Sequence, residues 1–124
     1  MGAQIASMAL RLFFLINLVL GLIFWITGND TLVGLHMVIG ILFVISLWVF
    51  SALVGLQTGN VGLVAGSFVL GLLIAILGLT QDSILEGGGH WIVQVLHLLL
   101  AVIAIGFAEM YGARARSKAK ARAS

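Results

Sequence analysis

The chain has 124 residues, of which 62% are hydrophobic and only 8% charged, and it contains neither proline nor cysteine. About a quarter of the residues of an average soluble domain are charged. This composition excludes a soluble enzyme or a soluble binding module and indicates an integral membrane protein.

Three long stretches carry no acidic or basic residue other than histidine, at residues 12–29, 31–81 and 87–108. A helix crosses the hydrocarbon core of a bilayer with roughly 20 apolar residues, so the middle stretch is long enough for two helices. The polar, helix-breaking cluster QTGN at 57–60 divides it. The sequence therefore predicts four membrane-spanning helices, at about 8–27, 32–55, 61–79 and 90–111.

The predicted connections are short, and short loops make consecutive helices antiparallel. The expected fold class is thus all-α: an integral membrane up-down-up-down four-helix bundle, formed by one domain at 1–112. A transmembrane β-barrel is excluded because the apolar runs do not alternate with a period of two. Residues 113–124 are expected to form a basic tail.

Charge predicts the orientation of this bundle. Of the six basic residues, Arg11 lies in the first helix and the other five lie in the tail RARSKAKARAS. The positive-inside rule therefore places both termini in the cytoplasm and the first and third loops outside. We expect a multi-pass protein of a prokaryotic-type inner or plasma membrane. The tail favours contact with anionic lipid over binding to nucleic acid.

Two polar residues and the glycines of the third helix predict contacts between helices or with a second protein. Asn17, midway along the first helix, is expected to hydrogen-bond to a neighbouring helix. Glu109 is expected to form an ion pair with Arg11 or Arg114, with proton relay as the alternative. The third helix carries glycines on two faces. One face is expected to pack inside the bundle and the other against a second protein, in a homo-oligomer or a larger membrane complex.

One stripe of the fourth helix carries polar side chains near the third loop and small side chains along the rest of its length. At 100° per residue its members fall within about 40° of one line. They are His90, Gln94, His97, Ala101, Ala104 and Ala108. We expect this stripe to face the interior of the bundle and the other faces to contact lipid.

The second helix supplies a partner for this stripe. At 1.5 Å per residue, His36 lies about 8 Å and His97 about 10 Å below the outer boundary, with His90 close to the boundary itself. The second and fourth helices of an up-down bundle lie diagonally across its core, so we expect His36 and His97 to face one another. Ionisable residues inside a membrane are functional-site candidates by default.

Two neutral imidazoles facing each other inside a bundle are typical of haem ligation, because the iron takes axial ligands on opposite faces of a flat ring. His36 and His97 would be the axial ligands of the iron. Gly40 and Ala101, each four residues after its histidine, would leave room for the ring.

The outer end of the same stripe would meet the propionates of such a haem. His90, Gln94 and Trp91 lie where those groups would emerge. Together, His36 with Gly40 and His97 with Ala101 resemble the small four-helix membrane b-type cytochromes.

This resemblance implies haem b held between histidines of different helices, and electron transfer to or from quinone. Two-haem members of that group carry two histidines near each membrane face. Here all three lie toward the outside, which fits one haem near the outer face. The expected function is one-electron transfer, or the holding of haem.

Two alternatives remain. His36, His90 and His97 could bind zinc or copper with Asp82 or Glu86 as a further ligand. The seven-residue spacing on the fourth helix, however, separates its two imidazoles by about 10 Å. The chain could also be a cofactor-free assembly or scaffold subunit of a larger membrane complex.

Overall fold

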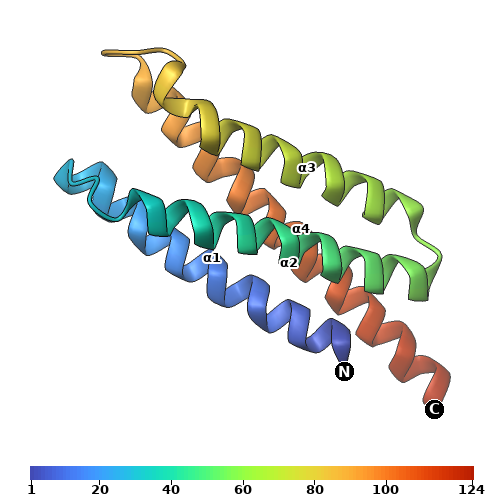
Figure 1. Cartoon of the computed structure of the whole chain (residues 1–124). Helices are drawn as coiled ribbons and strands as arrows, with labels where there is room; N and C mark the ends of the chain where they lie inside the picture. The colour runs from blue at the N-terminus through green and yellow to red at the C-terminus, as the bar shows by residue number, and fades with distance from the viewer.

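The computed structural model describes all 124 residues and contains no strand. Its elements are α1 (Gly2–Thr27), α2 (Val33–Thr58), α3 (Val61–Thr80), the short 3-10 helix η1 (Gln81–Ser83) and α4 (His90–Ala123). The four α-helices are each long and apolar enough to cross a membrane. They run up-down-up-down, with both termini at one end of the bundle (Figure 1). The predicted all-α, four-helix, multi-pass architecture is confirmed. We call the opposite end, which holds the α1–α2 and α3–α4 connections, the loop end.

Two helix boundaries differ from the predicted ones. α1 begins at Gly2 rather than near residue 8, and α4 continues to Ala123 instead of ending near 111. Alanine, arginine and lysine are strong helix formers, so the basic tail extends α4 without a break. With 34 residues, α4 is about 51 Å long against a hydrocarbon core of about 30 Å. Its last turns therefore extend beyond the hydrocarbon.

The α2–α3 turn divides the long apolar stretch where the sequence predicted. Gly59 ends α2 in the left-handed conformation, with φ of 68°. A residue with a Cβ is strained there, whereas glycine is not. Asn60 then caps α3, because its side-chain oxygen accepts a hydrogen bond from the N–H of Leu63 at 3.0 Å.

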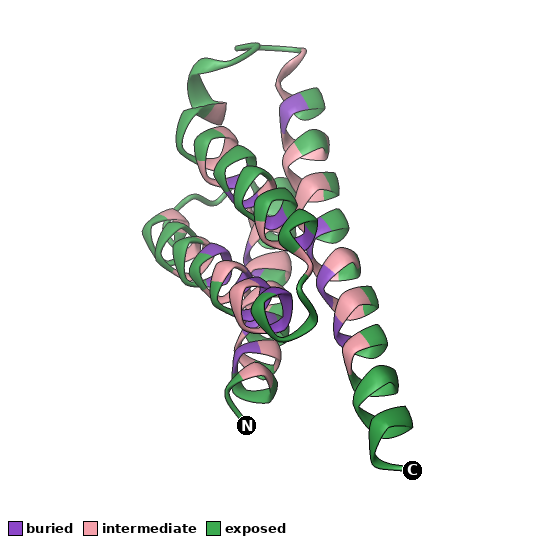
Figure 2. Cartoon of the chain, turned by 90° about the vertical axis from the view of Figure 1, so that its right-hand side faces the viewer, coloured by how far each residue is buried: buried purple, intermediate pink, exposed green.

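The helices pack around α2 and α4. The backbone of α4 approaches each of the other three helices, whereas the backbones of α1 and α3 stay apart. The core lies mainly toward the end with the termini, where Leu10, Leu47 and Leu63 are almost fully buried. Ala104 and Ala108 of α4 are buried as well, which confirms that the small stripe faces inward. Buried residues lie on the facing sides of the helices (Figure 2).

Most of the apolar surface faces outward. Only 18 of the 124 residues are buried, and large hydrophobic side chains are exposed along all four helices. A soluble monomer rarely exposes contiguous apolar surface on this scale. These outward faces fit contact with lipid.

Polar bonds and a close backbone approach hold α2 against α3. Ser51 donates to the hydroxyl of Ser67 at 2.6 Å, and the indole of Trp48 donates to the carbonyl of Ser67 at 3.2 Å. Gly71 lies against Trp48, and a Cβ there would collide with the indole. α3 can approach α2 this closely because Gly71 has no side chain.

The opposite face of α3, which carries Gly62 and Gly66, also has a contact within the chain. A Cβ at Gly66 would lie 3.5 Å from Phe107 of α4. Gly78, which shares the face of Gly71, packs against His97, as described below. Contacts within the chain therefore reach both glycine faces, and packing of one face against a second protein stays a prediction.

Candidate functional site

A cavity of about 550 Å³ lies between the four helices and reaches the loop end. Phe43, Val44 and Ile74, which belong to the hydrophobic core, line its deep side. The bundle is thus solidly packed toward the termini and hollow toward the loops. The volume lies within the range of about 300–1,000 Å³ that is usual for ligand pockets.

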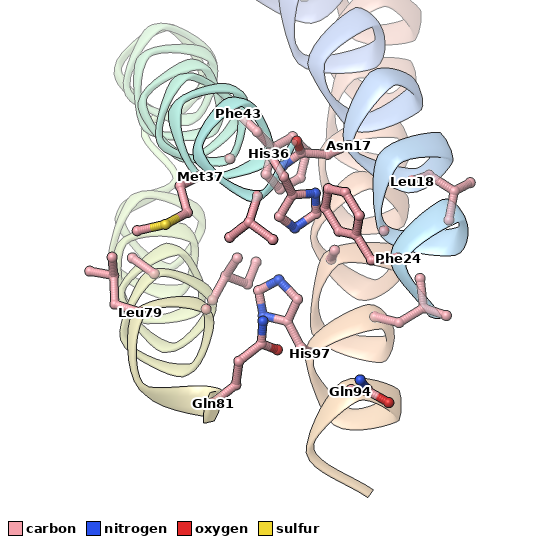
Figure 3. A pocket seen from close by; sticks show the side chains of 18 of the residues that line it. Asn17, Leu18, Phe24, His36, Met37, Phe43, Leu79, Gln81, Gln94 and His97 are labelled. Atoms are coloured by element: carbon pink, nitrogen blue, oxygen red, sulfur yellow. The ribbon is translucent and has the colours of Figure 1, made fainter. Parts of the chain in front are cut away.

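His36 and His97 face each other in this cavity (Figure 3). α2 presents His36 from its first turn, where the N–H of His36 bonds to the carbonyl of Leu32. α4 presents His97 seven residues, or about two turns, after its start. The centroids of the two imidazole rings are 6.4 Å apart, and the ring planes meet at 54°. The structure therefore brings together the two histidines that the sequence paired.

Both imidazoles have a buried nitrogen without a partner. Nδ1 of His36 and Nδ1 of His97 are shielded from solvent and form no hydrogen bond. A buried polar atom left without a partner costs about 1–3 kcal/mol. Such atoms are rare in native proteins and call for an explanation beyond stability. Because two such atoms lie in the same cavity, the pair of His36 and His97 is the candidate functional site of the chain.

Asn17 of α1 holds the backbone that carries His36. With its amide oriented by the surrounding partners, Asn17 donates to the carbonyl of His36 and accepts from the N–H of Gly40, both at 3.0 Å. A Cβ at Gly40 would lie 2.9 Å from this amide. The missing side chain of Gly40 thus makes room for Asn17, and Gly40 also lines the cavity, so its role in leaving room for a cofactor ring stays a prediction. Phe24 packs edge-on against His36, with centroids 5.5 Å apart.

Residues of α3 and η1, which were not among the predicted site residues, surround His97. A Cβ at Gly78 would lie only 3.0 Å from Cε1 of His97. Gln81 of η1 points toward the same ring (Figure 3) and lines the cavity. Ala101, one turn deeper on α4, lines the cavity below His97 as predicted.

Two of the three predicted rim residues, His90 and Gln94, lie at the mouth of the cavity. His90 is the first residue of α4, with Nδ1 3.4 Å from the carbonyl of Ile84. Gln94 lines the cavity one turn outward of His97. Trp91 is 55% exposed and does not line the cavity, so it faces outward, whereas Trp25 of α1 does line it.

The mouth of the cavity is acidic. Asp30 and Asp82 line it, and no lysine or arginine does. An anionic group entering the mouth would therefore have only neutral side chains and His90 as hydrogen-bond donors. Gln81 and Gln94 are the amides available for that purpose.

The zinc or copper alternative required His36, His90 and His97 to converge with Asp82 or Glu86. No group of three or more histidine or carboxylate side chains in the chain lies close enough to hold one metal ion. The structure therefore brings together one histidine pair and leaves His90 at the rim.

No known protein family, curated protein or solved structure matches this chain. Its function is to be inferred from the cavity and the histidines inside it.

Proposed function

We propose that this chain is a membrane-embedded haem b-binding protein in which His36 and His97 are the axial ligands. The observation that carries the proposal is the spacing of the two imidazoles. Metal–imidazole bonds are about 2.0 Å long and a ring nitrogen lies roughly 1 Å from its centroid, so trans imidazoles on one metal have centroids roughly 6 Å apart. The spacing of 6.4 Å between His36 and His97 agrees with this value.

The surroundings of the pair also support a flat apolar ligand. The cavity draws its lining mainly from hydrophobic side chains, and Gly21, Gly78 and Ala101 keep it open around the two imidazoles. Apolar walls exclude water from the site, and burial of this kind is one way in which a protein tunes a redox centre. Haem b, when bound, supplies reversible one-electron transfer.

The chain's own residues would set the position of that centre. Phe24 restricts the ring of His36 from the α1 side, and Asn17 fixes the backbone beneath it. Because Gly78 has no side chain, α3 can pack closely beside the ring of His97. His90 and Gln94 would then donate hydrogen bonds to the propionates at the mouth.

We further propose one haem per chain, near the outer face of the membrane. The half of the bundle toward the termini is filled by the hydrophobic core and contains no histidine, so it offers no second site. All basic residues lie toward that end or in the extension of α4, which favours its placement in the cytoplasm. Quinone dissolved in the bilayer is the proposed electron partner, and a haem-holding role is the alternative for the same site.

The test is an absorbance spectrum of protein purified in detergent from haem-replete cells, air-oxidised and then reduced with dithionite. A pyridine haemochrome assay counts haem per chain. We expect one haem and a sharp reduced α band. His36→Ala and His97→Ala should each abolish this band, whereas His90→Ala, a matched change at the rim of the same cavity, should retain it.

Circular dichroism of each variant verifies that the helices remain folded. A band that survives in both His36→Ala and His97→Ala would contradict the ligand assignment. A colourless wild-type protein that also fails to bind added haemin would contradict the haem function and favour the scaffold alternative.

A further inference from the structure

A second cavity, of about 330 Å³, lies at the other end of the bundle, between the extension of α4 and the α2–α3 turn. We call it the basic groove. Its lining includes two cations and several hydroxyl or amide groups, but no acidic residue. The polar lining residues are Thr58, Asn60, Tyr111, Arg114, Ser117 and Lys118.

Arg114 and Lys118 are four residues apart on α4 and therefore share one face of the helix. The guanidinium carbon of Arg114 lies 5.5 Å from the centroid of the Tyr111 ring. Tyr111 is in turn packed edge-on against Phe107, with centroids 4.7 Å apart. This stack holds the guanidinium of Arg114 at the groove. The chain's nearby carboxylate, Glu109, is bound to Arg11 instead.

The groove lies at the depth of lipid headgroups. Counted from His90 at 1.5 Å per residue, α4 leaves a hydrocarbon core of about 30 Å close to Met110. Arg114 and Lys118 follow roughly 6 and 12 Å beyond that point. The turn that carries Thr58 and Asn60 ends α2 at the same level, since these residues line the same groove.

We propose that the basic groove binds the phosphate of an anionic phospholipid headgroup between Arg114 and Lys118. A planar guanidinium matches two phosphate oxygens at once, and a lysine adds a compact charge. The hydroxyl of Ser117 donates to a remaining oxygen, whereas the hydroxyl of Thr58 already donates to the carbonyl of Val54 at 2.7 Å. Lipid is the expected occupant because the groove adjoins the exposed apolar faces of α2 and α4, which accommodate acyl chains.

Native mass spectrometry of the full chain in detergent, titrated with phosphatidylglycerol or phosphatidylcholine, tests this assignment. We expect Arg114→Gln with Lys118→Gln to weaken phosphatidylglycerol binding roughly tenfold or more. Lys120→Gln with Arg122→Gln removes the same charges further along the same helix, and should change binding less than about twofold. Phosphatidylcholine should bind more weakly than phosphatidylglycerol.

Equal losses in the two double variants would overturn the proposal, since they would indicate diffuse attraction by the whole tail. Equal binding of the two lipids would overturn it as well. Inorganic phosphate, added as a competitor, should not displace phosphatidylglycerol at equal concentration, and displacement would identify free phosphate as the occupant. The histidine cavity lies at the opposite end of the bundle, so none of these results depends on haem.

Discussion

Arg11 of α1 and Glu109 of α4 form a two-pronged ion pair that joins the first helix to the last. Nε of Arg11 lies 2.5 Å from Oε1 of Glu109, and Nη2 lies 2.7 Å from Oε2. The sequence predicted an ion pair of Glu109 with either Arg11 or Arg114. A proton-relay role for Glu109 was the alternative. Because both carboxylate oxygens of Glu109 are bound to Arg11, the ion-pair interpretation is confirmed and Arg11 is its partner.

We expect Arg11→Gln to destabilise the bundle more than Glu109→Gln. Without Glu109, the long side chain of Arg11 can extend to the headgroups, whereas an unpaired Glu109 stays close to hydrocarbon. The two side chains are 53% and 38% exposed, so the pair itself contributes about 0.2–1 kcal/mol. Unfolding in mixed detergent micelles with increasing dodecyl sulfate measures the difference.

The charge-swapped variant, with Arg11→Glu and Glu109→Arg together, is the control for this prediction. It should recover most of the stability lost in the single variants, because the pair is restored. A swap no more stable than either single variant would show that the pair does not link the two helices.

Gly78→Ala should disturb His97 specifically. The added methyl carbon would lie 3.0 Å from Cε1 of His97, closer than side chains normally approach, so the imidazole must move by a few tenths of an ångström. We expect lower haem occupancy or a shifted reduced α band. Gly106→Ala is the matched control, because a Cβ there meets nothing within 4 Å. If both variants keep the wild-type spectrum and haem content, α3 does not position His97.

Asn17→Ala should loosen the turn that carries His36. The substitution removes two hydrogen bonds to the backbone of α2. Hydrogen bonds between membrane helices contribute about 0.6 kcal/mol each on average, so a loss of about 1 kcal/mol is expected, together with a broader haem spectrum. Ser46→Ala is the control, since Ser46 bonds only to the carbonyl of Leu42 on its own helix. Equal effects of the two changes would argue against a positioning role for Asn17.

The histidine pair was predictable from the sequence because regular helix geometry and loop length determine it. Helical rise places His36 and His97 at similar depth, and helical periodicity aligns His97 with Ala101 and Ala104. Short loops then fix which helices are neighbours. None of these steps requires knowledge of how side chains pack.

The contacts that the sequence did not predict depend on packing between helices. Gly40 contacts Asn17, and Gly78 contacts His97, because each helix is rotated about its axis by the combined fit of several neighbours. That rotation and the relative register of α3 and α4 are not encoded in any one helix. The end of α4 differed for another reason: hydropathy marks the bilayer boundary, whereas a run of alanine, arginine and lysine lets the helix continue past it.

The orientation of the bundle can be tested with single cysteines, because the chain contains none. Glu86 lies exposed in the α3–α4 connection and Ser124 at the end of α4, so Glu86→Cys and Ser124→Cys sample opposite ends. The positive-inside rule predicts that a membrane-impermeant maleimide labels Glu86→Cys in intact bacterial cells and Ser124→Cys only after permeabilisation. The unsubstituted chain should take up no label. The reverse pattern would place the histidine cavity on the cytoplasmic side, so haem would then have to enter and leave from the cytoplasm.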